Sequence, residues 1–441
     1  MDLEKIIDNL NAKNKSTRLG NLKKIVRLIN NGSIKVDASD EVNNHVHTKY
    51  SFSPYSPTMA AYKAFSAGLQ AVGIMDHDSV SGAREMIEAC KIINMASTVG
   101  FEVRVNFDKT KIEGKKINNP DSENIVYIAL HGVPANKLKE AKEFLKPISK
   151  ERNKRNLLMV ESLNKILEKH KIEKIDFKKD IYEQSMAKEG GSITERYLLY
   201  ALSLKLIKKM GKGEKLVEFL KDRFEINVEG KLRGYLIDEK NPFYIYDLLG
   251  ALKSSFLPEI FIQPDNNECI SVFDAVKFGN SINAIPVYAY LGDITDSPTG
   301  DKKAEKFEDD FLDDLFPELK RIGFKGITYM PPRNTLKQLL RVQELCKKYE
   351  FMEISGVDIN TPRQSFNCPI IKEESFSHLI GSTWALIAHE KLATFNAQYG
   401  LFNPDNPISG KTLRERIRIY SEIGKKIDNR HPEKIGSLIN F

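Results

Sequence analysis

Between Val42 and Asn360 the chain repeats one pattern, in which a short apolar run is followed by polar or ionisable residues. The run AVGIM is followed by Asp76, NIVYIAL by His131 and FMEISGV closely by Asp358, and segments of helical character separate the runs. Strands that alternate with helices predict a mostly parallel sheet. Polar residues at the carboxyl ends of several such strands are typical of the active face of a β/α barrel. We therefore predict an α/β barrel with its functional side chains at one end.

Three segments lie outside this alternation and are predicted to be helical. Residues 1–40 carry apolar residues on one helical face and end at the turn sequence NNGS. Residues 137–235 are predicted to form a helical insertion between barrel strands, and residues 371–441 a helical C-terminal extension. The barrel itself is expected over residues 41–370.

The composition is that of an ordinary globular protein, with 41% hydrophobic and 29% charged residues. No apolar run reaches the ~18 residues that cross a bilayer, and the start MDLEKIIDNL lacks the apolar core of a signal peptide. The four cysteines are far apart and form no CxxC pair. We expect a cytoplasmic protein with reduced thiols and no membrane partner. The oligomeric state is not predicted.

The net charge of +7 is unevenly distributed along the chain. Residues 137–179 hold fourteen Lys or Arg and seven Asp or Glu, an excess equal to that of the whole chain. A basic flank can attract phosphorylated or polyanionic ligands. However, the lysines alternate with acids at helical spacing and aromatic residues are few, which favours a solvated helical face. Both interpretations stay open.

Imidazole and carboxylate groups recur at the ends of the apolar runs. His45 and His47 flank one valine, so in an extended chain both side chains point to the same face. A lone HxH is more often structural than metal-binding, and Asp-His-Asp is also typical of a turn. Together, however, these groups at strand ends predict a site for zinc, manganese or iron, in which a carboxylate can bridge two ions. The complete set is His45, His47, Asp76, His77, Glu102, His131 and Asp358.

Four segments resemble, in order, the motifs of the PHP (polymerase and histidinol phosphatase) superfamily. They are HVHTKYSFSPYSP, VGIMDHDSVSGA, GFEVRV and ISGVDIN, and the interval of 31 residues from His45 to Asp76 is usual in that family. The resemblance covers about residues 41–370. It implies a distorted (β/α)7 TIM-like barrel that hydrolyses phosphoesters. The surrounding sequence is also similar to a stand-alone bacterial subfamily without an assigned activity.

The resemblance also implies ligands for up to three metal ions. The first ion would be held by His45, His47, Glu102 and Asp358. The second would share Glu102 and use His131, although a strict alignment places this ligand nearer Tyr127. The third would use His77. All of these residues are present in the chain.

Four positions depart from the family pattern. Phe52 replaces a metal-binding acid, Tyr197 and Asn360 replace histidines, and Tyr290 lies in the strand end that reads AHP in relatives. We therefore expect one or two ions, with Tyr197, Tyr290 and Asn360 as donors to phosphate or supports of the ligands.

The sequence thus predicts a metal-dependent phosphoesterase acting on a small phosphorylated metabolite or nucleotide. Metal-activated water would attack phosphorus near Glu102, and Asp76 or His77 would orient or shuttle protons. Loop cations would hold the phosphate; they are Arg333, Arg363, Lys302 and Lys303. Two alternatives are a nuclease for nucleic-acid 5′ ends and a barrel that has lost catalysis and binds a ligand or partner protein.

Overall fold

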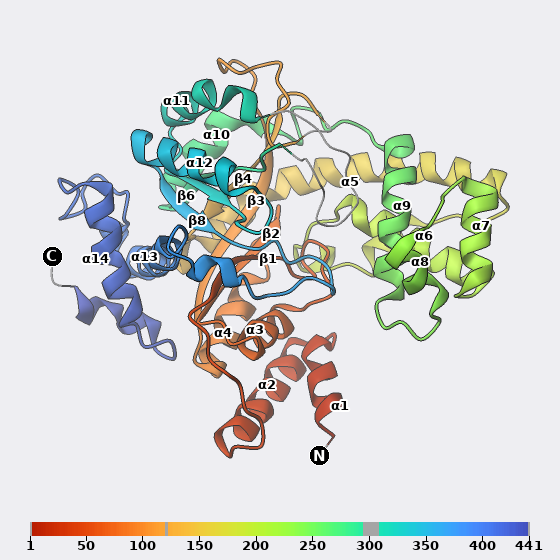
Figure 1. Cartoon of the computed structure of the whole chain (residues 1–441), viewed down its shortest axis with the longest axis horizontal. Coiled ribbons are helices and arrows are strands. Elements are labelled where there is room, and N and C mark those ends of the chain that lie inside the picture. The colour runs from red at the N-terminus through yellow and green to blue at the C-terminus, as the bar shows by residue number, and fades with distance from the viewer. Residues whose placement is uncertain (1, 120–121, 294–307, 440–441) are drawn as a thin grey trace.

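A sheet of seven strands curls into a nearly closed barrel at the centre of the computed structural model, which describes residues 2–119, 122–293 and 308–439 (Figure 1). Around the barrel the order is β1 (Val42–Val46), β2 (Ala71–His77), β3 (Ala96–Asn106), β4 (Ile125–His131), β6 (Ile285–Ala289), β7 (Gly326–Tyr329) and β8 (Met352–Ser355). The two-residue β5 (Ile270–Ser271) pairs with β3. Backbone hydrogen bonds from Ile359 to His45 and from His47 to Ile359 join β1 to the segment after β8. The predicted barrel is confirmed.

One strand, β4, runs antiparallel to both of its neighbours, while the other strand pairs are parallel. Ala129 lies opposite Glu102, and His131 lies opposite Ile285, the first residue of β6. The carboxyl end of β4 is therefore at the amino end of the other strands. The apolar run did not indicate this reversal, because a buried strand has the same composition in either direction.

The amino end of the barrel is covered by the C-terminal extension. Helix α13 (His378–Phe395) shares one apolar core with barrel residues that include Met75, Ala129 and Met352. The carboxylate of Glu390 on α13 accepts hydrogen bonds from Thr98 Oγ1 at 2.8 Å and from the backbone N of Val99 at 2.6 Å. Helix α14 (Leu413–Lys425) packs against α13 (Figure 1). The extension therefore closes the end of the barrel at which its strands begin.

The remaining helices surround the barrel or extend from it. The N-terminal helices 3–8 and 15–30 pack against each other, and the second of them packs on helix 83–93. These outer helices are α1 (Leu3–Asp8), α2 (Lys15–Asn30), α3 (Pro57–Ser66), α4 (Ala83–Ile93), α10 (Val272–Ser281), α11 (Leu312–Ile322) and α12 (Leu336–Tyr349). Ser56 caps α3 by accepting a hydrogen bond from the backbone N of Met59, and Pro57 begins the helix. This cap ends the loop that follows His47.

The helical insertion lies to one side of the barrel with a core of its own (Figure 1). It contains α5 (Leu138–Lys169), α6 (Glu195–Met210), α7 (Glu214–Phe224), α8 (Gly230–Ile237) and α9 (Tyr244–Ile260). Its helices continue to Ile260, so the predicted end near residue 235 was too early. One barrel residue, Phe52, belongs to this core. The loop after His47 therefore connects the insertion to the barrel mouth.

Two expectations from composition can be compared with the structure. The four cysteines are buried and form no disulfide. Among the described residues, no helix has both the length and the apolarity needed to cross a bilayer.

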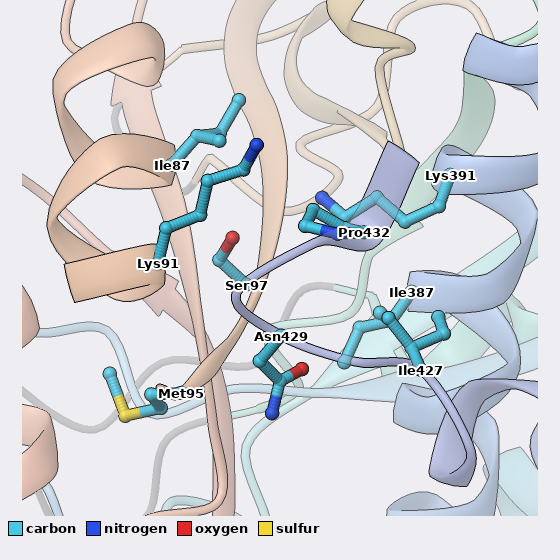
Figure 2. A pocket seen from close by; sticks show the side chains of 9 residues that line it. All are labelled: Ile87, Lys91, Met95, Ser97, Ile387, Lys391, Ile427, Asn429 and Pro432. Atoms are coloured by element: carbon cyan, nitrogen blue, oxygen red, sulfur yellow. The ribbon is translucent and has the colours of Figure 1, made fainter. Parts of the chain in front are cut away.

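A small hollow lies where α4 and the start of β3 meet the C-terminal extension (Figure 2). Two lysines, Lys91 and Lys391, line it together with Ser97 and several apolar residues. Lys91 pairs with Glu433 at 2.9 Å and Lys391 with Glu390 at 2.5 Å. Since its cations are already paired, and it lies where β3 begins, this hollow does not contribute to the site described next.

Candidate metal centre

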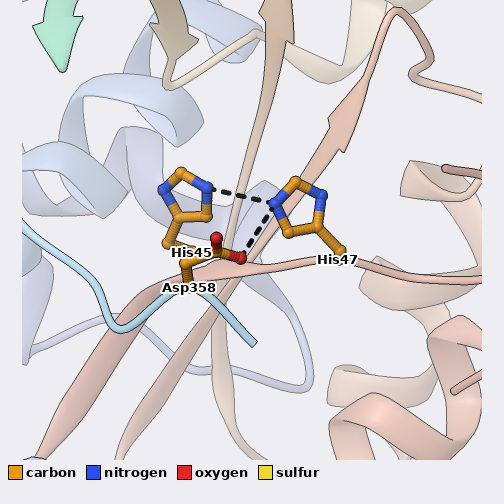
Figure 3. Close-up of side chains that lie close together, drawn as sticks. All are labelled: His45, His47 and Asp358. Carbon is orange, nitrogen blue, oxygen red and sulfur yellow. Dashed lines mark hydrogen bonds and ion pairs between the residues drawn. The ribbon is translucent and has the colours of Figure 1, made fainter. Parts of the chain in front are cut away.

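Imidazole and carboxylate groups from three parts of the chain meet at the carboxyl end of the barrel. His45 and His47 come from β1 and the residue after it, Glu102 from β3, and Asp358 from the segment after β8. His45 Nε2 lies 3.2 Å from His47 Nε2, and His47 Nε2 lies 3.2 Å from Asp358 Oδ1. Dashed lines mark both contacts in Figure 3. Glu102 also lies near both histidines, with Oε1 at 3.2 Å from His45 Nε2 and Oε2 at 3.7 Å from His47 Nε2.

His77 completes this histidine cluster, which we define as His45, His47, His77, Glu102 and Asp358. His77 Nδ1 lies 3.1 Å from Glu102 Oε2. The ligand atoms fall into two overlapping groups, His45–His47–Asp358 and His47–His77–Glu102, each within 4.8 Å. The side chain of His47 is 1% exposed, whereas those of His77 and Asp358 are 27% and 34% exposed. The cluster therefore opens to solvent beside His77 and Asp358.

The spacing of these atoms fits a metal ion. Ligand atoms about 2.0–2.2 Å from a tetrahedral zinc lie about 3.4 Å from one another, close to the separations of 3.1–3.7 Å in the cluster. Nitrogen and carboxylate ligands suit zinc, manganese and iron. The residues present could thus hold a divalent cation of this kind, while the donor set does not select one metal.

Electrostatics keep both carboxylates of the cluster ionised. Burial would raise the pKa of Glu102, but the neighbouring histidines, His45 first, lower it to about 2. Burial opposes ionisation of Asp358 as well, yet His47, His45 and Arg196 hold its pKa below the usual range. Burial lowers the pKa of His45, but Glu102 and Asp358 outweigh it and raise that pKa to about 9. The metal-free cluster therefore attracts positive charge.

His77 differs from His45 in its protonation. Burial lowers the pKa of His77 to about 3, and the attraction of Glu102 does not offset this. Its imidazole is therefore neutral near pH 7. Partial exposure places it where a substrate could reach it.

Asp76 lies beside the cluster and belongs to neither ligand group. Its carboxylate accepts hydrogen bonds from the backbone N and the hydroxyl of Thr48, both at 2.7 Å, and from the hydroxyl of Ser51 at 2.6 Å. Ser51 Oγ is also 3.2 Å from His47 Nδ1. Asp76 thus holds the loop that follows the two histidines. Sequence reasoning missed Ser51, because a serine in a Ser-rich loop has no distinguishing pattern.

His131, predicted as a ligand, is not brought into either group. The reversal of β4 puts it at the amino end of the barrel strands. Burial lowers its pKa to about 3, and neither ring nitrogen forms a hydrogen bond within the described part of the chain. Tyr127, at the start of the same strand, is closer to the site, with its ring centroid 5.8 Å from that of His77. The ligand of a second ion at this strand stays a prediction.

Two of the unusual residues contact each other. Phe52 and Tyr197, which replace predicted metal ligands, pack edge to face with their centroids 4.9 Å apart. Phe52 adopts a positive φ of 79°, which is uncommon for a side chain of this size. The hydroxyl of Tyr197 donates to the backbone O of Lys49 at 2.8 Å. These two positions thus join α6 to the loop after His47.

The third unusual residue, Asn360, supports a ligand directly. Its Nδ2 donates to both carboxylate oxygens of Asp358, at 2.8 and 2.9 Å. Nη1 of Arg196, on α6, lies 3.5 Å from the backbone O of Asn360. Sequence reasoning missed Arg196, which reaches the site from the insertion.

The remaining predicted phosphate ligands have partners in other segments. Tyr290 donates to Asp309 Oδ1 at 2.5 Å. Arg363 forms two hydrogen bonds to Asp247, at 2.7 and 2.8 Å, and stacks on Tyr235 at 3.5 Å. Arg333 Nε lies 3.3 Å from the backbone O of Leu291. Lys302 and Lys303 lie outside the described residues.

A second buried cluster, also missed in the sequence, lies next along β3. This arginine cluster consists of Asp78, Arg104, Arg152, Arg155, Glu195 and Glu268. Arg104 and Arg155 contact Glu195 Oε1 at 2.6 and 2.7 Å. Glu268 binds Arg155 at 2.6 and 2.9 Å and Arg152 at 3.2 Å. The partners come from distant parts of the chain, so no local sequence motif predicts this cluster.

Comparison with known proteins gives one family match and remote structural likenesses. The PHP domain family matches residues 43–220. No curated protein matches the chain. A crystal structure provisionally named a metal-dependent phosphoesterase, from Bifidobacterium adolescentis, has 16% identity and a TM-score of 0.48. An amidohydrolase from Chromobacterium violaceum, with bound sulfate and no metal, has 16% identity and a TM-score of 0.47. Each covers 77% of this chain and 96% of its own.

Proposed function

The chain carries a PHP domain, and from this premise we propose that it is a metal-dependent hydrolase of phosphoesters. The observation that carries the proposal is the convergence of His45, His47 and Asp358, whose ligand atoms all lie within 4.8 Å of one another, with Glu102 Oε1 3.2 Å from His45 Nε2. When bound, such an ion would activate a water and polarise a phosphoryl oxygen. Zinc, manganese and iron are the candidates.

In this proposal the buried side chains hold the ion and the more exposed ones face the substrate. Buried His45, His47 and Glu102 hold the ion, and Asn360 orients the more exposed Asp358 through its two hydrogen bonds. His77, neutral and partly exposed, lies 3.1 Å from Glu102 and would orient the attacking water. Because the two ligand groups share His47, we propose one tightly held ion, with a second only if Glu102 bridges both.

Phosphate binding is assigned to Arg196. Its positive charge lowers the pKa of Asp358, so it acts close to the cluster, and its side chain is half-buried at the barrel mouth. A guanidinium can bind two phosphate oxygens at once. Arg363 is less suited, since Asp247 already binds its guanidinium at two atoms.

A small phosphorylated metabolite or nucleotide is favoured over a nucleic acid. Lys146 and Lys154 on α5, and Lys137 just before it, pair with glutamates three residues away in the sequence. The buried Arg152 and Arg155 are bound by acids of the arginine cluster. Acids thus lie among the basic side chains of this segment and weaken its attraction for a polyanion.

The test is a panel of phosphomonoesters and phosphodiesters, assayed with manganese, zinc and iron and accompanied by metal analysis. We expect about one ion per chain and hydrolysis that Glu102→Gln abolishes. The matched control is Glu88→Gln, whose carboxylate on α4 pairs with Lys15 on the outer surface. Negligible metal after loading, or activity that Glu102→Gln leaves unchanged, would contradict the proposal. Metal without hydrolysis of any ester would favour a barrel that only binds ligands.

A further inference from the structure

Ser51 connects the carboxylate of Asp76, which lies in neither ligand group, with His47, a predicted metal ligand. Its hydroxyl lies 2.6 Å from Asp76 Oδ1 and 3.2 Å from His47 Nδ1. Both neighbours are buried, Asp76 and His47 each at 1% exposure, and Ser51 is buried as well. A serine hydroxyl has a single proton to donate. Ser51 can therefore donate to only one of its two neighbours.

The position of Thr48 identifies the neighbour that accepts this hydrogen bond. Its backbone N–H, which can only donate, points to the same Asp76 Oδ1 at 2.7 Å. Oδ1 is therefore an acceptor that carries no proton, and the hydroxyl of Ser51 must be the donor to it. The Ser51 oxygen is then left to accept a hydrogen bond, which His47 Nδ1 can supply only if it carries a hydrogen.

From these contacts we infer that Ser51, held by Asp76, fixes His47 in the Nδ1–H tautomer. The lone pair of Nε2 then faces the cluster, where Nε2 lies 3.2 Å from His45 Nε2 and from Asp358 Oδ1. Ser51 and Asp76 are thus positioning residues for a ligand, a role that outer partners of metal-binding histidines commonly have. This inference rests on the proposed metal site and refines the part that Asp76 has in it.

Without Ser51, the opposite tautomer has a ready partner. A hydrogen on His47 Nε2 would bond to Asp358 Oδ1, which lies 3.2 Å from that atom. A metal ion would then have to displace it. We therefore expect Ser51→Ala to weaken metal binding by roughly 10- to 100-fold, the range for loss of such an outer partner.

The direct test is the tautomer itself, read from nitrogen chemical shifts of His47 in protein with ¹⁵N-labelled histidine, with the signal assigned by His47→Gln. Metal-free wild type, at a pH where His47 is neutral, should carry hydrogen on Nδ1. Ser51→Ala should gain the Nε2–H form. The matched control, Ser53→Ala, removes a hydroxyl two residues away. Among the described residues this hydroxyl accepts from the backbone N of Tyr55, so the variant should leave the tautomer and the metal affinity unchanged.

A second variant, Asp76→Asn, tests the hydrogen-bond chain from Asp76 through Ser51 to His47 while it keeps the shape of the side chain. The amide oxygen must stay at the Oδ1 position to accept from Thr48 N, which leaves the amide nitrogen facing Thr48 Oγ1. Ser51 therefore keeps its acceptor, and His47 should keep the Nδ1–H tautomer. The Nε2–H tautomer in Asp76→Asn would overturn the inference.

These readouts separate the inference from the proposed function. If wild type binds zinc, and Ser51→Ala keeps the same zinc affinity and the same tautomer, the inference is overturned and the hydrolase proposal stands. If wild type binds no metal, the hydrolase proposal fails. The tautomer in metal-free protein still decides the inference: Nδ1–H that is lost in Ser51→Ala supports it, and Nε2–H in wild type overturns it.

Discussion

The histidine cluster and the arginine cluster are neighbours on β3, where Glu102 and Arg104 are two residues apart and share one face. Both are buried and rich in charge. In the arginine cluster three guanidinium groups face three carboxylates, including Asp78, which pairs with Arg152 at 2.8 Å. Its cations are part of the chain. In the histidine cluster, nitrogen and oxygen ligand atoms converge on one another, so the balancing cation has to be a proton or an external ion. Buried charge alone therefore does not indicate a metal site.

The largest expected effect is in the histidine cluster. Glu102→Gln removes the charge that touches three histidines. We expect metal affinity to fall by more than about 100-fold, because losing a mere support of a ligand already costs 10- to 100-fold. Elemental analysis after gel filtration and chelator competition measure it. Affinity equal to that of Glu88→Gln would remove Glu102 from the ligand set.

The arginine cluster should respond in stability and not in metal content. Glu268→Gln leaves Arg152 and Arg155 without their shared carboxylate, and breaking a buried ion pair in this way costs about 3–5 kcal/mol. Urea unfolding of the metal-free protein measures the loss. The folded variant should still bind metal as wild type does. A loss of metal with little change in stability would contradict the division between the clusters.

The pH dependence of metal binding sharpens the same contrast. In the metal-free protein the pKa of His45 is raised to about 9, above the ordinary value of about 6.5. Its contribution to the free energy of unfolding is complete below about pH 6.5 and is lost as the pH rises through 9. A metal ion needs the unprotonated imidazole, so affinity should rise about tenfold per pH unit and level off near pH 9. Chelator competition at several pH values measures this, and a flat profile would contradict it.

Glu102 limits this behaviour at the acid end. Its pKa is lowered to about 2, so the stability it contributes is present above the ordinary glutamate pKa and is lost as the pH falls through about 2. Over pH 6–9 this carboxylate does not titrate, so it adds nothing to the slope predicted from His45. A slope much steeper than tenfold per unit would require a second proton.

The contrast between the clusters also explains what could be predicted from sequence. His45, His47, Glu102 and Asp358 could be grouped because each follows or lies in a barrel strand, and strand ends meet in space. His131 could not be placed, since its strand runs in the opposite direction. The arginine cluster was invisible because Arg155 and Glu268 are 113 residues apart and helical segments of the insertion lie between them. The barrel alternation therefore predicts neighbours within the sheet and not those supplied by the insertion.

The smallest expected effect concerns Tyr197, which stands where the family resemblance implies a metal ligand. Its hydroxyl instead donates to the backbone O of Lys49 at 2.8 Å. Tyr197→Phe should cost about 0.5–1.5 kcal/mol of stability, the net value of one such hydrogen bond. The matched control is Tyr200→Phe, from the same aromatic cluster on α6, where no hydrogen bond of the hydroxyl is described. Metal affinity should be unchanged in both variants, because neither ring belongs to a ligand group. A tenfold loss of affinity in Tyr197→Phe alone would place this oxygen at a metal, and the boundary between the site and the insertion would then have to be redrawn.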